Sequence, residues 1–300
     1  MTAADQQPDL HPRAVVLATD VGFCEGPVVT RSGELICVSW DHGRLYEVAD
    51  GAARVRAELG VGANGATEGP DGRLFIAQSG GQAPGHRPAF RYGHTGGIQV
   101  VDHDGTMTWL TMDPIRPNDL CFGPDGALWV TDPHQTRRDD GRIWRFDADT
   151  GVGDLLTTVD FYTNGLGFGP SDDVLFVADT YGSRIVTLTI DGDRLGAPQT
   201  FAQLDGLHPD GFAFDTEGNI VVGAVSLSER PGEVQVYSPG GELLDRFMPG
   251  PGSHFTNVAL TPEGALVICD SRSGRVLAVP DWGAAPLALH PRPNPTTTSA

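Results

Sequence analysis

The sequence predicts an all-β fold, a six-bladed β-propeller. Six copies of one motif support this prediction: an oxygen-bearing side chain, an apolar strand, a turn rich in Gly, Pro and Asp, and a second apolar strand. The leading side chains are spaced by 39, 54, 46, 46 and 47 positions, close to the roughly 40 to 50 residues of a propeller blade. A repeat built only of strands and turns favours four-stranded blades around a central channel. The leading residues are Glu25, Asn64, Asn118, Asn164, Asp210 and Asn257.

The predicted domain organisation follows the chain in order. We expect residues 1–12 to be a flexible leader, residues 13–290 a single propeller domain and residues 291–300 a flexible tail. The apolar run at 14–19 precedes the first repeat, so we expect it to complete the last blade as an outer strand and to remove an open sheet edge. The run at 286–290 is the alternative candidate for that place.

The clearest copy of the motif runs from Arg116 to Asp132, with strands at 120–122 and 127–131 joined by a Gly-Pro-Asp-Gly turn. In every copy the second strand returns to the side of the leading residue, so the loops that follow it surround one mouth. The longest, 79–96, is expected to form a partial lid, with a solvated insertion as the alternative. The six loops span 40–43, 79–96, 134–140, 181–183, 227–231 and 271–273.

Three acidic residues recur at the end of the second strand: Asp132, Asp179 and Asp270. Each could be mistaken for a catalytic carboxylate. Because the position repeats, we interpret them as caps that accept hydrogen bonds from the backbone of the following turn.

Composition excludes several classes of partner. The chain has 300 residues and a net charge of −19, with 20 Lys and Arg against 39 Asp and Glu, which argues against nucleic acid and anionic membranes. Its four cysteines have no metal-finger spacing and are expected to be small buried hydrophobes. No targeting segment or long apolar run is present, so a cytoplasmic protein is expected. The expected partner is a small-molecule substrate, and the expected assembly a monomer or homodimer.

The six leading side chains should meet near the channel axis. Carboxylate and amide oxygens, with no Cys or His among them, are hard ligands suited to a divalent cation. The sequence therefore predicts a metal site in the central channel, with Ca²⁺ as first choice and Mg²⁺, Mn²⁺ or Zn²⁺ as alternatives. The competing interpretation is that the leading residues only form turns, since Asn-Gly and Asp-Gly are common turn sequences. Glu25 would be a poor turn residue, which argues against it.

In these residues the sequence resembles the senescence marker protein, gluconolactonase and luciferin-regenerating-enzyme family of six-bladed propellers. The resemblance covers nearly the whole chain and implies hydrolysis of a lactone, often a sugar lactone; some relatives cleave phosphotriesters. Departures at the mouth, such as His208 and Asn64, argue more against a sugar than against the metal. The motifs that carry the resemblance are Glu25-Gly26-Pro27, Arg116-Pro117-Asn118-Asp119, Thr163-Asn164-Gly165 and Pro209-Asp210-Gly211.

The resemblance also implies roles for individual residues. Glu25, Asn164 and Asp210 would hold a divalent metal, with Asn118 near it or reaching it through water. Arg116 and Asn118 would contact the substrate. Chemical reasoning then makes Asp210 the general base that activates water while the metal polarises the carbonyl.

Two further residues, Asp119 and His208, are alternative bases or substrate contacts, and His208 could equally be a packed histidine. Three other functions stay open at this point. They are a phosphotriesterase-like hydrolase, a pathway-specific metal-dependent dehydratase or isomerase, and a non-catalytic binding propeller stabilised by metal.

Overall fold

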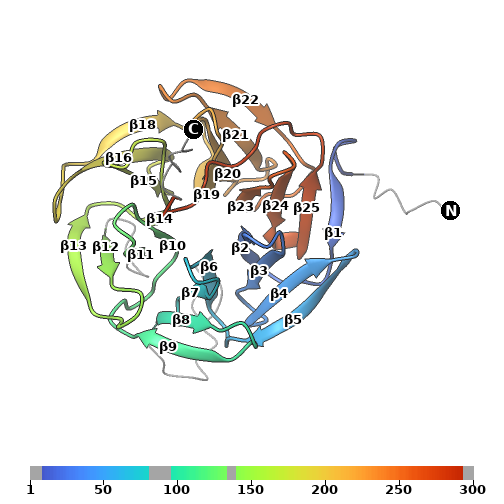
Figure 1. Ribbon diagram of the computed structural model, residues 1–300. Coiled ribbons are helices and arrows are strands. Elements are labelled where there is room, and N and C mark those ends of the chain that lie inside the picture. The colour runs from blue at the N-terminus through green and yellow to red at the C-terminus, as the bar shows by residue number, and fades with distance from the viewer. Residues whose placement is uncertain (1–8, 81–95, 134–139, 293–300) are drawn as a thin grey trace, which may run out of the picture.

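Six antiparallel sheets surround a central channel in the computed structural model, which describes residues 9–80, 96–133 and 140–292 (Figure 1). The predicted six-bladed propeller is therefore confirmed. Most of the expected lid at 79–96 lies outside the described residues, as does most of the loop at 134–140. Among the residues that the structure describes, no helix is long and apolar enough to cross a membrane.

Five of the six blades are built from consecutive strands, and the sixth also includes the first strand of the chain's described part. The first contains β2 (Cys24–Val29), β3 (Leu35–Ser39), β4 (Arg44–Ala49) and β5 (Ala52–Glu58). The second contains β6 (Ala63–Glu68), β7 (Leu74–Gln78), β8 (Gly97–Val101) and β9 (Met107–Thr111). The third contains β10 (Leu120–Phe122), β11 (Leu128–Pro133), β12 (Gly141–Phe146) and β13 (Gly153–Val159).

The fourth contains β14 (Thr163–Phe168), β15 (Val174–Asp179), β16 (Arg184–Asp191), the short β17 (Arg194–Leu195) and β18 (Gln199–Gln203). The fifth contains β19 (His208–Phe214), β20 (Ile220–Val225), β21 (Glu233–Tyr237) and β22 (Leu243–Phe247). The sixth contains β23 (Phe255–Leu260), β24 (Leu266–Asp270), β25 (Arg275–Val279) and β1 (Val15–Ala18). The 3₁₀-helix η1 (Ser271–Ser273) follows β24.

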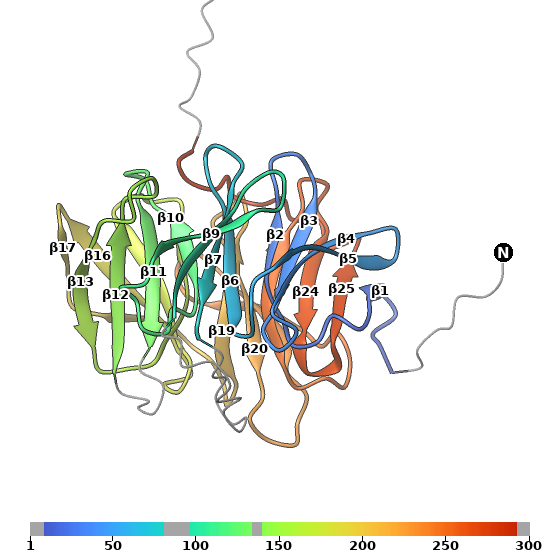
Figure 2. The same ribbon diagram turned by 90° about the horizontal axis from the view of Figure 1, so that it is seen from below.

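The ring is closed by β1, which pairs antiparallel with β25 and so completes the sixth blade. This confirms the predicted closing strand. The alternative segment forms no strand: it makes an isolated bridge between Pro286 and Asp215, and Leu287 N–H donates to Phe214 O at 2.8 Å. Residues 286–290 line a second cavity, and Figure 2 shows the ring of blades from the side. Beside β1, the His11 backbone N–H donates to Pro249 O at 2.8 Å.

The hydrophobic core lies between neighbouring blades rather than in one central mass. Phe75 of the second blade meets Phe122 of the third edge to face, with ring centroids 5.2 Å apart. Trp129 of the third blade meets Phe168 of the fourth in the same way, at 5.4 Å. Because each sheet buries both faces against its neighbours, the strands carry runs of apolar residues instead of strict alternation.

The leading residues require one correction. We expected each to precede its first strand, but only Asn118 does so; the other five lie within the innermost strands. Their pairing is interrupted by register shifts, such as those between Glu25 and Val28 and between Pro209 and Phe212. A β-bulge rotates the chain locally and can redirect a side chain, which accounts for polar groups aimed at the channel from within an apolar strand.

Candidate active site

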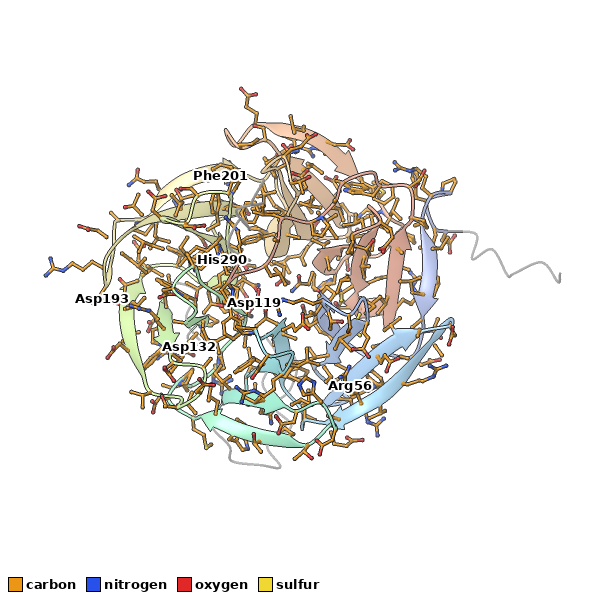
Figure 3. The ribbon with its side chains drawn as sticks, viewed as in Figure 1. Arg56, Asp119, Asp132, Asp193, Phe201 and His290 are labelled. Carbon is orange, nitrogen blue, oxygen red and sulfur yellow. The ribbon has the colours of Figure 1, made fainter. Side chains whose placement is uncertain are left out.

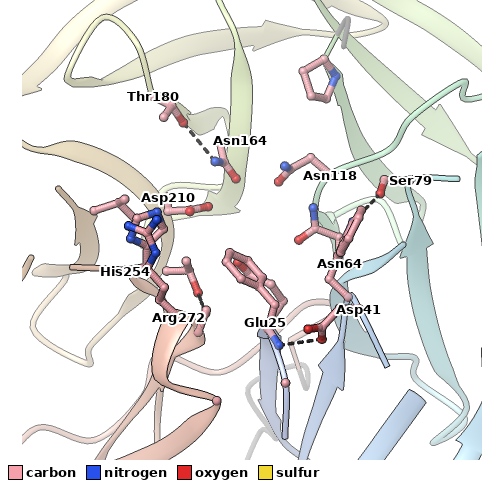
Figure 4. Close-up of a pocket in the computed structure, with 18 of the residues that line it drawn as sticks. Glu25, Asp41, Asn64, Ser79, Asn118, Asn164, Thr180, Asp210, His254 and Arg272 are labelled. Atoms are coloured by element: carbon pink, nitrogen blue, oxygen red, sulfur yellow. Dashed lines mark hydrogen bonds between the residues drawn. The ribbon is translucent and has the colours of Figure 1, made fainter. Parts of the chain in front are cut away.

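A cavity of about 890 Å³ opens at the channel mouth, on the side of the second-strand loops. Five of the six leading side chains line it, and Figure 4 shows them around a common space. A cavity of this size suits a small organic ligand. The five residues are Glu25, Asn64, Asn118, Asn164 and Asp210.

Hydrogen bonds within and between blades hold Asn164 and Asn118 in place. The Asn164 side-chain amide donates to Thr180 Oγ1 at 3.0 Å, and the Thr180 hydroxyl donates to Pro209 O at 2.9 Å. Asn118 accepts at its backbone oxygen from Gly65 N–H at 2.8 Å. A Cβ on Gly65 would lie 2.7 Å from the Asp119 Cα, so this position accepts only glycine at the observed spacing of the inner strands.

The carboxyl groups of Glu25 and Asp210 lie in an environment that disfavours their charged forms. Burial raises the pKa of Glu25 well above its usual value, and the nearby Asp210 raises it further. Burial likewise raises the pKa of Asp210 to about 7, with a further contribution from Asp119. Within the described ranges, no arginine or histidine forms an ion pair with either group.

This arrangement fits a bound divalent cation. The buried Glu25 carboxylate and the half-buried Asp210 carboxylate have no cationic partner within the described ranges. Together with the amide oxygens that they face, they form a hard donor set whose charge a divalent cation would neutralise. No group of three or more His, Cys, Asp or Glu suited to a metal occurs in the part of the chain described. The expected ligands contain only two carboxylates, so such a group is not required.

A pH-dependent stability follows for metal-free protein. Because the folded-state pKa of Asp210 is raised, its contribution favours folding at low pH and is lost as pH rises from its ordinary value of 3.8 to about 7. Without metal, we therefore expect the Asp210→Asn variant to lose less thermal stability than wild type across this range. Added Ca²⁺ should flatten the wild-type profile. Melting temperatures in EDTA and in Ca²⁺ test this, and identical slopes for both proteins would contradict it.

Arg116 lines the same cavity and is held through its backbone. Its N–H donates to Asp132 Oδ1 at 2.7 Å, and Ile115 N–H donates to Asp132 Oδ2 at 3.2 Å. Asp132 is fully buried and pairs with Arg142 at 3.1 Å. Asp132 thus binds the loop before Asn118. We expected it to accept hydrogen bonds from the turn that follows it, and most of that turn lies outside the described residues. Asp179 does bind the following turn, through Gly182 N–H at 2.8 Å.

Three predicted or candidate residues lie outside this cavity. Asp119 lies near the axis (Figure 3) but lines a second cavity of about 420 Å³, where burial raises its pKa to about 7. Asn257 lines the same second cavity, and Thr256 occupies the mouth in its place. His208 Nδ1 lies 2.8 Å from Thr180 O and is not part of the mouth wall. Roles for Asp119 and His208 in catalysis or substrate binding stay predictions.

The match to a known family decides the classification. The family model of the SMP-30/gluconolactonase/LRE-like region matches residues 23–271. The chain belongs to this family. The family expected from the sequence motifs is therefore confirmed.

Individual members of the SMP-30/gluconolactonase-like family are distant in sequence. A gluconolactonase from Zymomonas mobilis is 26% identical over 299 residues, covering 85% of this chain and 78% of that protein. A solved gluconolactonase from Xanthomonas campestris has 23% identity and a TM-score of 0.71, covering 88% of each chain. A calcium-binding regucalcin from Agrobacterium tumefaciens has 20% identity and a TM-score of 0.70, covering 88% of this chain and 92% of that one.

Sequence reasoning placed Trp40, Tyr181, Leu227 and Arg272 in loops around the mouth of this SMP-30/gluconolactonase-like chain but gave them no individual role. Pro133, Thr180 and Ser271 all line the cavity, and each directly follows one of the recurring aspartates. The position directly after each recurring aspartate could have been used to predict these wall residues. Hydrogen bonds hold the aspartate in place, and they therefore also restrain the residue that follows it. Three wall residues with aromatic rings lie outside the six predicted loops and were not predicted. They are Phe23, Tyr162 and His254.

Proposed function

We propose that the protein is a lactonase that opens a small cyclic ester and uses one divalent cation, with Ca²⁺ as first choice. Membership of the family and the gluconolactonases among its relatives support lactone hydrolysis as the general activity. One observation carries the finer proposal: Glu25 and Asp210 face amide oxygens in a cavity of about 890 Å³ and have no ion pair within the described ranges. The calcium-binding relative supports the choice of metal.

Glu25, Asn164 and Asp210 would hold the cation, with Asn118 beside it. When bound, a divalent cation acts as a Lewis acid that polarises a carbonyl and stabilises the negative charge that develops on its oxygen. The Asp210 carboxylate accepts a proton from the attacking water, a task suited to a group on the cavity wall. The Arg116 guanidinium and the Asn118 amide donate hydrogen bonds that orient the ester.

Hydrolysis of a lactone panel by metal-stripped protein tests this function. The panel covers gluconolactone, aliphatic lactones and aromatic lactones, each with Ca²⁺, Mn²⁺, Zn²⁺ or Mg²⁺ added back after EDTA treatment. We expect turnover to be lost in EDTA and restored by Ca²⁺, because the ester carbonyl is activated only when the carboxylates hold a cation.

Other results would redirect the assignment. Turnover of a phosphotriester but of no lactone would favour the phosphotriesterase-like alternative. Stabilisation by metal without hydrolysis of any ester would favour a dehydratase or isomerase, or a binding propeller. Lactone turnover that is unchanged by EDTA would contradict the metal-dependent mechanism while leaving the lactonase activity in place.

A further inference from the structure

Arg272 presents a positive charge to the mouth cavity. Its side chain is exposed and lines the cavity with the carboxylates, on the wall that also carries His254 (Figure 4). Among the described residues no carboxylate, carbonyl or aromatic ring pairs with its guanidinium. The chain has a net charge of −19, so acidic side chains outnumber basic ones and an arginine would be expected to find an acidic partner. The lack of such a partner for Arg272 among the described residues therefore calls for an explanation.

The backbone around Arg272 is held rigidly. Arg272 is the central residue of η1, and the preceding Ser271 is buried. The Ser271 hydroxyl bonds both to the Thr256 hydroxyl and to the Cys24 carbonyl oxygen, and its N–H donates to His254 O at 3.0 Å. Cys24 directly precedes Glu25, so these bonds tie the base of Arg272 to the strand that carries a predicted metal ligand.

Arg272 also lies across the ring from Arg116. Arg116 precedes the third blade and Arg272 follows the second strand of the sixth. In a ring of six blades the third and the sixth stand opposite each other (Figure 1). Both line the same cavity. A ligand whose reacting ester lies beside Arg116 and Asn118 can therefore extend past the carboxylates toward Arg272.

Two acidic residues have other partners. Asp270, two residues before Arg272 in the sequence, forms an ion pair with Arg275, and Asp41 lines the same cavity as Arg272. Asp41 Oδ1 accepts from Phe23 N–H at 2.7 Å, from His42 N–H at 3.0 Å and from the Ser39 hydroxyl at 3.1 Å. Within the described ranges neither carboxylate forms an ion pair with Arg272. Arg272 thus keeps its donors for a ligand.

We propose that Arg272 binds an anionic oxygen group, a carboxylate or a phosphate ester, on the substrate, so that the preferred lactone carries a negative charge away from its ring ester. This deepens the proposed function and rests on it. The guanidinium matches such groups because its planar fork of N–H donors can form two parallel hydrogen bonds to their oxygens. Arg272 is a specificity-determining residue in this proposal and takes no part in bond breaking.

Kinetic discrimination between matched lactones tests the assignment. The substrates are butyrolactone, the same ring bearing a carboxylate, and the same ring bearing a phosphomethyl group. We expect wild type to favour one or both anionic rings by about 10- to 100-fold in kcat/KM, as is typical of hydrogen bonds to charged groups. Arg272→Gln should remove that ratio, mainly through KM, and Arg272→Lys should retain part of it.

Arg194→Gln is the matched control, because Arg194 is an exposed arginine on β17, away from the cavity lining, and its loss changes the net charge equally. The control should keep the wild-type ratio. The two anionic rings distinguish a carboxylate from a phosphate. An unchanged ratio in Arg272→Gln, or a wild type that does not favour either anionic ring, would overturn the proposal.

Equilibrium binding separates this proposal from the lactonase proposal. Cyclopentanone and its carboxylated and phosphomethyl derivatives resemble the lactones but cannot be hydrolysed. Calorimetry should show tighter binding of at least one anionic ring to wild type, weakened about 10-fold or more in Arg272→Gln. This result would support the anion site even if no lactone were turned over. Equal affinity of both proteins for the anionic rings would overturn it, even if lactones were hydrolysed.

Discussion

Asp210→Asn is expected to lower kcat for lactone opening by about two to four orders of magnitude, the range typical of a lost general base. The amide cannot accept a proton from water, and the exchange also removes one of the two negative charges that would hold the cation. The side chains have nearly the same shape, so the β19 strand should fold unchanged. Turnover at saturating Ca²⁺, together with circular dichroism, measures the effect.

Asp245→Asn is the matched control, since Asp245 is an exposed aspartate on the outer strand β22. It should retain wild-type turnover. Calcium titrations separate the two roles of Asp210: loss of turnover with calcium affinity retained would support the role of base. Turnover by Asp210→Asn within about twofold of wild type would show that another group activates water.

Asp132→Ala is expected to lower the free energy of unfolding by about 3 to 5 kcal/mol, as is typical when one partner of a buried ion pair is removed. The Arg142 guanidinium would lose its partner, and the backbone N–H groups of Ile115 and Arg116 would lose their acceptor. Because the loop before Asn118 depends on these bonds, lactone turnover should fall as well. Urea denaturation and steady-state kinetics measure the two effects.

Asp50→Ala provides the comparison, because Asp50 and Arg54 form an ion pair in which both side chains are mostly exposed. Exposed pairs contribute roughly 0 to 1 kcal/mol. Equal losses from Asp132→Ala and Asp50→Ala would show that burial of the Asp132–Arg142 pair adds nothing to stability. Lost stability with normal turnover would show that the loop does not need Asp132 for its active shape.

The fold was predictable because propeller blades repeat both in sequence and in space. Six copies of a strand–turn–strand motif fixed the number of blades, and an unassigned apolar run before the first copy indicated the closing strand β1. The positions of the leading residues within their strands were not predictable to one residue. A bulge adds a residue to one strand only, and this irregularity decided that Thr256 rather than Asn257 faces the mouth.

In the candidate site, too, the residues that belong to the repeat were predictable and those positioned by long-range contacts were not. Glu25, Asn118, Asn164 and Asp210 were found because they occupy equivalent places in the repeat, and the structure brings them to one cavity. Arg272 lies in a predicted mouth loop, but its place on the cavity wall depends on η1 and on the bonds of Ser271 to distant Thr256 and Cys24. Contacts between residues far apart in the chain leave no periodic trace in the sequence, so such wall residues required the structure.

The closure by β1 also has a consequence for biosynthesis. During translation β1 is made before every other strand, yet its partner β25 is the last strand of the ring to be made. The first strand must therefore wait, unpaired, while five blades and most of the sixth are synthesised. The ribosome can release a nearly complete ring before its final contact forms, and an unpaired strand edge favours association with other chains during that interval. A bulky domain fused ahead of β1 stays attached to the strand that must dock last, so it should slow the closing pairing and lower the yield of folded protein more than the same domain fused after residue 292.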